Sequence, residues 1–321
     1  MDPKAYRKQL ATQLKQLAAQ KVKGNAFRDA RASDEARFEA LQSLRVLDRS
    51  DDAQAALELA RDASKGAKLR AAAIKGLGVT LSREPQAVEL LLRILGDLAE
   101  PVAVRSAALS ALKVAAFHVK AFYEQRPQFI AALRKAAQAE DVDLRRRALA
   151  VLAREKDAPT QKRLIAGLEQ PEKALLPPDK ALLFLSYDVK LDLHDLLHRI
   201  VKAPPSEPAR LQALRLLAAD ASSKALFEKL LKNKKESTEA RLIALQALHT
   251  LEPKKLQTQA GKIIGDSKED DDLREACLVA VATFGKTETP LLRNNAAKMQ
   301  KNAGTSSARQ AAKRYLAKRG V

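Results

Sequence analysis

The chain has 321 residues, of which one is cysteine (Cys277) and none is tryptophan. A single cysteine excludes a disulfide framework, and the apolar runs are far too short to span a membrane, so we expect a cytoplasmic protein without membrane insertion. The formal net charge of +19 exceeds what solubility requires and indicates a polyanionic partner.

The first 24 residues are strongly basic. They carry a net charge of +5, and Leu10, Leu14 and Leu17 recur at helical spacing. This pattern predicts a basic amphipathic helix. We expect it to cap the open end of the array that follows, so the domain organisation is a capping helix at 1–24 and one continuous domain at 25–321.

From Arg37 onward, a motif of the form Arg-x-x-Ala-(Leu/Ile)-x-x-Leu returns about every 33 residues. Its apolar positions form one stripe of a helix, and a second amphipathic stretch follows each copy. Two such helices bury both of their apolar faces only by stacking on neighbouring pairs, so the motif predicts a helical solenoid. The motif arginines are Arg37, Arg70, Arg105, Arg145, Arg210, Arg241, Arg274 and Arg309.

One copy of the motif, around Lys180, is degenerate. Pro171, Pro177 and Pro178 interrupt the pattern there, and the arginine is lost. We therefore expect the weakest joint of the array at 170–190. Sustained alternation of apolar and polar residues, which would indicate strands, does not occur along the chain.

These repeats resemble the HEAT-repeat family in its short bacterial form, in which a (Val/Leu)-Arg-x-x-Ala segment opens one helix of each pair. The (Val/Leu)-Arg dipeptide of that segment occurs at Leu69-Arg70, Val104-Arg105, Leu144-Arg145 and Leu273-Arg274. The resemblance implies an all-α fold, a right-handed α-solenoid of about nine helical pairs. It also implies that the motif arginines are structural and form a ladder with an Asp of the same or a neighbouring repeat.

If the arginine-bearing helices line a concave surface, as HEAT geometry implies, positions beyond the core stripe face that surface. The residues there are mostly basic, which fits contact with a phosphate backbone. The candidate nucleic-acid-binding residues are Arg45, Lys75, Lys113, Arg146, Arg147, Arg154, Arg215 and His249. The chain has few aromatic residues for base stacking, so any binding would be to backbone or shape.

The segment His194-Asp195-Leu196-Leu197-His198 places two imidazoles at i and i+4, a spacing that zinc sites use. The sequence offers only Asp192 or Asp188 as a third ligand, and its leucines are typical of an ordinary repeat helix. We therefore predict no metal, no cofactor and no catalytic residue.

The sequence favours a non-enzymatic, monomeric binding module whose basic surface holds nucleic-acid backbone. A scaffold for an acidic protein partner is the alternative. A HEAT-like DNA glycosylase is a third interpretation, although such enzymes use tryptophan, which is missing here. Deoxyhypusine hydroxylases are HEAT arrays that bind iron through His-Glu dipeptides, and this chain has none.

Overall fold

The computed structural model describes residues 26–43, 47, 50–78, 81, 85–118, 122–283 and 290–318. The regular secondary structure of these residues is helical, which confirms the all-α class. The predicted capping helix at 1–24 lies outside them. Contacts between Cα atoms group the chain into two compact units, 1–165 and 166–321. None of the described helices is both long and apolar enough to cross a membrane.

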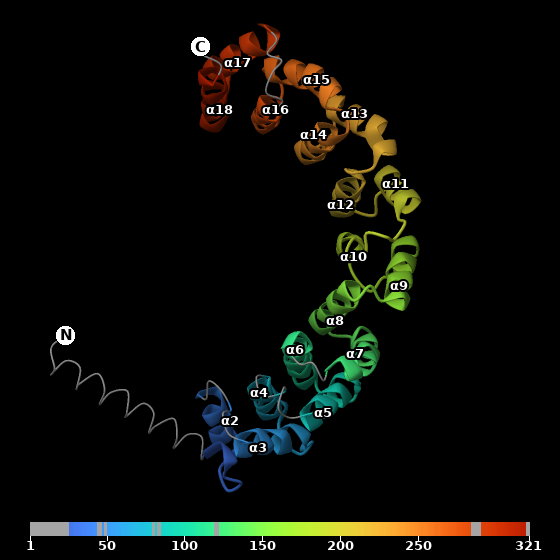
Figure 1. Ribbon diagram of the computed structural model, residues 1–321, viewed down its shortest axis with the longest axis vertical. Helices are drawn as coiled ribbons and strands as arrows, with labels where there is room; N and C mark the ends of the chain where they lie inside the picture. The colour runs from blue at the N-terminus through green and yellow to red at the C-terminus, as the bar shows by residue number, and fades with distance from the viewer. Residues whose placement is uncertain are drawn as a thin grey trace, which may run out of the picture. The chain divides into compact units, whose positions relative to one another are not determined.

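The first unit consists of helices that alternate between two layers (Figure 1). One layer stacks α2 to α4, α4 to α6 and α6 to α8, while α5 packs on α7 in the other layer. The bounds are α2 Asp34–Ser43, α3 Ser50–Arg61, α4 Ala67–Leu77, α5 Pro85–Gly96, α6 Val102–His118, α7 Phe122–Ala136, α8 Val142–Arg154 and α9 Ala158–Glu169, which runs past the boundary of the unit.

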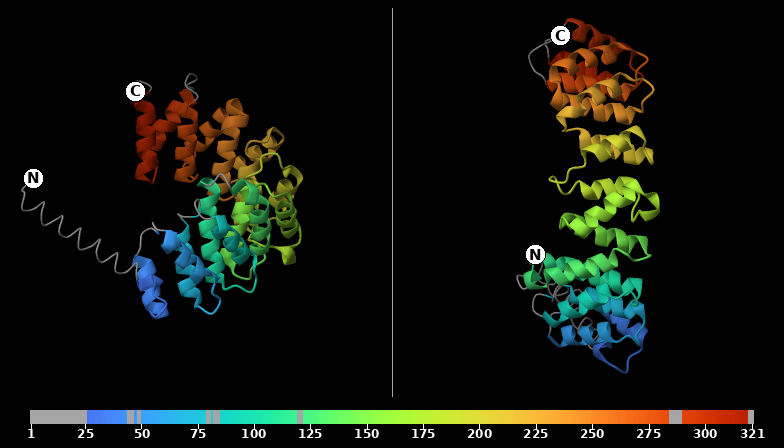
Figure 2. Two further views of the ribbon diagram at one scale, coloured as in Figure 1. Left: turned by 60° about the horizontal axis from the view of Figure 1, so that its bottom comes forward. Right: turned by 90° about the vertical axis from the view of Figure 1, so that its right-hand side faces the viewer.

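The second unit repeats this alternation (Figure 2). Helices α10, α12, α14, α16 and α18 stack in one layer, and α15 packs on α17 in the other. The bounds are η1 Pro171–Lys173, α10 Pro178–Leu185, α11 His194–Lys202, α12 Glu207–Leu217, η2 Ala221–Ser223, α13 Lys224–Lys232, α14 Thr238–Leu251, α15 Pro253–Gly265, α16 Asp271–Thr283, α17 Pro290–Asn302 and α18 Ser306–Ala317.

The core of each unit forms from the positions that the motif marks as apolar. Ala73, Ala108, Ala213 and Ala244, each three residues after a motif arginine, are fully buried. Their small side chains let neighbouring helices approach closely, and the leucines that follow fill the space between them. Cys277 occupies the same position in α16, where burial raises the pKa of its thiol to about 12, so it is a core residue rather than a nucleophile.

Helix starts follow the sequence signals. Asp141, Ser206, Ser237 and Thr305 each accept a hydrogen bond from the backbone N–H three residues later and so cap α8, α12, α14 and α18. Proline stands in the first turn of α10, α12 and α15. The backbone N–H that proline lacks would have no hydrogen-bond partner within the helix at that position, so no helical hydrogen bond is lost. Each motif arginine in α8, α12, α14 and α18 thus lies one turn beyond a fixed helix start.

The buried motif arginines share one contact. In Arg37, Arg70, Arg105, Arg241 and Arg274 the Nε atom donates to the carbonyl oxygen of the residue ten positions earlier, at 3.0–3.3 Å. That carbonyl belongs to the end of the preceding helix in four of the five repeats, where backbone acceptors lack an intrahelical partner. These contacts support the structural role expected for the five arginines, with a backbone carbonyl as their common acceptor. The expected Asp partner is seen at Arg274, which pairs with Asp271 at 2.7 Å.

Candidate metal centre

The described residues that were predicted to contact nucleic acid lie on α4, α6 and α8 in the first unit and on α12 and α14 in the second. Lys75 (α4), Arg146 and Arg154 (α8) and Arg215 (α12) are exposed. Lys113, Arg147 and His249 are half-buried. Arg45 lies outside the described residues.

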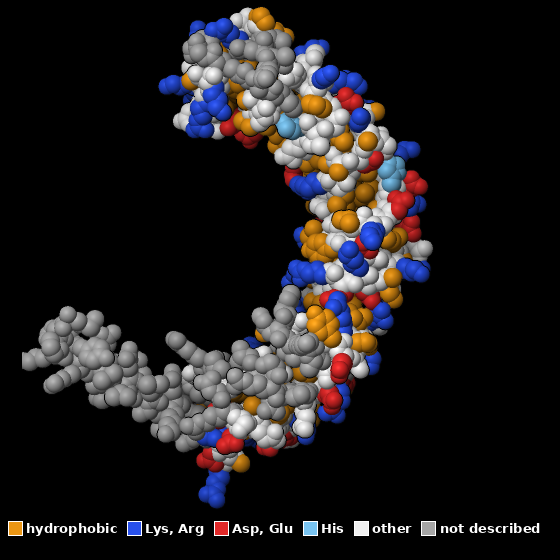
Figure 3. All heavy atoms as spheres, in the orientation of Figure 1, with side chains coloured by type: hydrophobic (Ala, Val, Ile, Leu, Met, Phe, Trp, Pro, Cys, Tyr) orange, Lys and Arg blue, Asp and Glu red, His pale blue; other side chains and the backbone are white. Residues whose placement is uncertain are grey.

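Several of these cations already have carboxylate partners within the protein. Arg146 Nη2 lies 2.6 Å from Asp143 Oδ1, and Arg147 Nη1 lies 3.7 Å from Asp143 Oδ2. Arg147 also donates to Ser110 Oγ at 2.6 Å, and Arg215 pairs with Glu239 of the next repeat. On the face drawn in Figure 3, blue and red side chains lie interspersed. Two carboxylates, Asp143 and Glu239, thus face three of the predicted cations, which weakens the support for a phosphate-binding groove at these positions.

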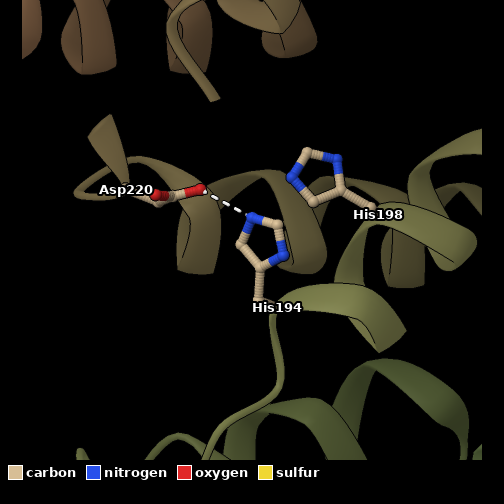
Figure 4. Close-up of side chains that lie close together, drawn as sticks. All are labelled: His194, His198 and Asp220. Atoms are coloured by element: carbon tan, nitrogen blue, oxygen red, sulfur yellow. Dashed lines mark ion pairs between the residues drawn. The ribbon is translucent and has the colours of Figure 1, made fainter. Parts of the chain in front are cut away.

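The histidine pair is in a different setting. His194 begins α11, and His198 follows one turn later, so both imidazoles leave the same side of the helix. Their ring centroids are 4.5 Å apart. The turn η2, one helix further along the chain, brings Asp220 to them, and the three side chains converge (Figure 4). One ligand atom from each of the three residues lies within 4.8 Å of the other two.

The atoms that face the centre of this cluster are the Nε2 atoms of the imidazoles and one carboxylate oxygen. His194 Nε2 lies 3.2 Å from Asp220 Oδ2. Each imidazole also meets one serine of η2: His194 Nε2 is 2.9 Å from Ser222 Oγ, and His198 Nε2 is 3.1 Å from Ser223 Oγ. Both hydroxyls donate to Asp220 Oδ2, at 2.6 and 2.7 Å.

A second carboxylate orients the first imidazole. Asp195 Oδ1 lies 3.3 Å from His194 Nδ1, on the side of the ring away from the cluster. A carboxylate that accepts from Nδ1 directs the lone pair of Nε2 toward a metal and makes it more basic. The hydrogen bond with Asp195 is the largest cause that raises the pKa of His194, and the charge of Asp220 adds to it. Hydrogen bonds from Ser222 and Ser223 lower the pKa of Asp220, so this carboxylate is ionised at neutral pH.

The third member of the cluster is Asp220, whereas the sequence suggested Asp192 or Asp188. Asp192 caps the backbone N–H of His194, and Asp188 accepts from the backbone of Lys190, so both serve the local turn. Asp220 lies 26 residues after His194 and reaches the cluster because η2 follows α12, which packs against α11. A sequence feature that points to Asp220 is the segment Asp220-Ala-Ser-Ser, in which an aspartate precedes two serines in the pattern of a capped turn.

No model of a protein family matches the sequence, and neither does any curated protein. Among solved structures, human deoxyhypusine hydroxylase in complex with glycerol is similar over 75% of this chain and 97% of that chain, with 15% sequence identity and a TM-score of 0.31. That protein is an enzyme by name. Similarity at this level assigns no activity to the chain.

The prediction of a non-enzymatic module that binds nucleic acid, with a protein scaffold as its alternative, is wrong. On the described part of the chain, three of the predicted cations are paired with carboxylates, so the inferred groove is not an uncompensated basic surface. In addition, the chain assembles a His–His–Asp group of a kind that holds metal ions in enzymes. The predicted partners and the monomeric state stay predictions.

Proposed function

We propose that this chain is a HEAT-like repeat protein that binds a divalent transition-metal ion of the zinc class at His194, His198 and Asp220. The repeats and their ladder of buried arginines support the family assignment. The observation that carries the function is the convergence of two imidazole Nε2 atoms and one carboxylate oxygen within 4.8 Å. The single cysteine, which is buried, fits the cytoplasmic location that forms part of the same proposal.

The donor set selects the metal. Imidazole nitrogens favour zinc, copper, iron and nickel, whereas calcium and magnesium prefer sites built only of oxygen. Three protein ligands leave a position of a tetrahedral ion open, which is the arrangement of catalytic rather than structural zinc sites. His194 is exposed, so water or a small substrate can reach that position. An ion held in this way lowers the pKa of a bound water, which supports metal-dependent hydrolysis as the class of chemistry.

The cluster also resembles the Ser–His–Asp triad of enzymes with a serine nucleophile. In that interpretation the nucleophile would be Ser222, the base His194 and the orienting carboxylate Asp195. Two contacts argue against that interpretation. The hydroxyl of Ser222 donates to Asp220 Oδ2 at 2.6 Å, so its proton is not directed at the imidazole. The side chain of Asp195 is 98% exposed, whereas the orienting carboxylate of such a triad is buried. The metal site is therefore the better-supported function.

Isothermal titration of the metal-free protein with Zn²⁺ tests this proposal. The wild-type chain should bind one ion per chain. The double variant His194→Gln/His198→Gln should lose at least tenfold in affinity, about 1.4 kcal/mol, because two of three ligands are gone. The matched control is His249→Gln, which removes a histidine of α14 that is not part of the cluster and should bind as the wild type does. Equal affinity in all three proteins would overturn the proposal.

A further inference from the structure

A second site lies in the same unit, between α14 and α16. It is a groove of about 540 Å³ with an apolar floor that includes Leu245, Ala276 and Val279. Val279 is 55% exposed, so its side chain offers apolar surface to a molecule in the groove. The volume falls in the range of pockets that hold small organic molecules.

The polar side chains divide the groove into two ends. Asp272 and Glu275, from the first turns of α16, lie at one end. His249 and Thr283, near the C-terminal ends of their helices, lie at the other, with Nε2 and Oγ1 2.8 Å apart. The groove therefore runs from an acidic end along an apolar floor to an end lined by a histidine and a threonine.

The charge of this groove is opposite to that of the chain. Lys and Arg outnumber Asp and Glu by 58 to 39 in the whole sequence, yet neither Lys nor Arg is among the described residues that line the groove. Among the described residues, no cation pairs with the carboxylate of Asp272. Glu275 accepts one hydrogen bond, from Ser307 Oγ at 3.0 Å, and keeps acceptor capacity. An acidic residue at a helix start is common, but that preference does not account for an exposed valine beside two carboxylates.

We infer that this groove binds a small amphipathic organic cation. Its ammonium or guanidinium group lies against Asp272 and Glu275, and its apolar body covers Val279 and Ala276. Charge-assisted hydrogen bonds to the carboxylates orient the ligand, while burial of the apolar body supplies most of the affinity. This inference is independent of the metal site, because none of the three metal-binding residues lines the groove.

Titration with n-octylammonium tests the inference, and neutral 1-octanol reports on the apolar floor alone. The wild-type protein should bind octylammonium more tightly than octanol. The variant Asp272→Asn/Glu275→Gln should weaken octylammonium about tenfold and leave octanol unchanged, and Val279→Ser should weaken both. Unchanged octanol binding also shows that the carboxylate variant keeps its fold.

The matched control is Glu58→Gln/Glu172→Gln, which removes two exposed carboxylates elsewhere and raises the net positive charge of the protein by the same amount. It should bind octylammonium as the wild type does. The inference is overturned if octylammonium does not bind, if it binds no more tightly than octanol, or if both double variants weaken it to the same extent.

Discussion

The guanidinium of Arg70 forms a bidentate pair with the carboxylate of Glu100, with Nη1 and Nη2 at 2.8 and 2.7 Å from the two oxygens. Glu100 stands five residues before Arg105, the next motif arginine. The same register recurs in Arg210 with Glu236 and in Arg241 with Glu269. A carboxylate at the start of one repeat thus neutralises the arginine of the repeat before it.

Arg105 departs from this register. The acid at the corresponding position is Glu140, which is exposed. The next motif arginine follows Arg105 by 40 residues, whereas the other consecutive motif arginines within an unbroken run are 31 to 35 residues apart. Arg105 keeps its hydrogen bond to the Leu95 carbonyl, yet its Nη2 atom is buried with no hydrogen-bond partner. Burial also lowers the pKa of its guanidinium.

Arg70→Met and Arg105→Met should therefore differ in stability. Arg70→Met leaves the half-buried Glu100 without its partner and should cost about 3 kcal/mol, whereas Arg105→Met removes an uncompensated charge and should cost about 1 kcal/mol or less. Both arginines lie in the first unit, so urea unfolding followed by circular dichroism compares them directly. Equal losses would show that the carboxylate contributes little.

The pair of Arg241 and Glu269 should make stability depend on pH. The hydrogen bond from Arg241 lowers the pKa of Glu269, so its stabilising contribution is complete above the unfolded value, about 4.3, and is lost as the pH falls through the folded value. The difference in melting temperature between wild type and Glu269→Gln should therefore be largest near neutral pH and shrink in acid. A difference that grew on acidification would contradict this sign.

Asp195 is a positioning residue for the metal site. Asp195→Asn keeps the size of the side chain but weakens its hold on His194 Nδ1, so Zn²⁺ affinity should fall about tenfold with the stoichiometry unchanged. The matched control is Asp192→Asn, which changes a nearby carboxylate that accepts a hydrogen bond from the backbone N–H of His194 and not from its imidazole. A loss as large in the control as in Asp195→Asn would assign the effect to net charge.

Lys156 lies two residues after the end of α8, and its backbone is in the left-handed region, with φ at 53°. Its N–H and that of Asp157 close the helix on the carbonyls of Ala153 and Leu152. Glycine adopts this conformation without steric cost, so Lys156→Gly should raise stability by about 1 kcal/mol. Lys162→Gly, at an exposed position inside α9, should instead lower it by about 1 kcal/mol. Thermal unfolding of the two variants compares these effects, and a loss of stability in Lys156→Gly would refute the first.

The repeat could be derived from the sequence because its period and its small residues recur locally. Ala73 and Leu77 are buried where the motif places them. The charge distribution could not be derived in this way. Pairs such as Arg215 with Glu239 join positions 24 residues apart in sequence, and their partners depend on how successive repeats stack. The role of Asp220 as the third ligand could not be predicted for the same reason, because its approach to His194 depends on how α12 packs against α11.

X-ray absorption at the zinc edge of the Zn²⁺-loaded protein tests the central claim most directly. The account predicts a low-coordinate ion with two imidazole nitrogens at about 2.0 Å and one carboxylate oxygen at about 2.0–2.2 Å, the fourth place being taken by water. The imidazole signal should disappear in His194→Gln/His198→Gln. An ion surrounded only by oxygen, or an imidazole signal that persists in that variant, would contradict the assignment of this site.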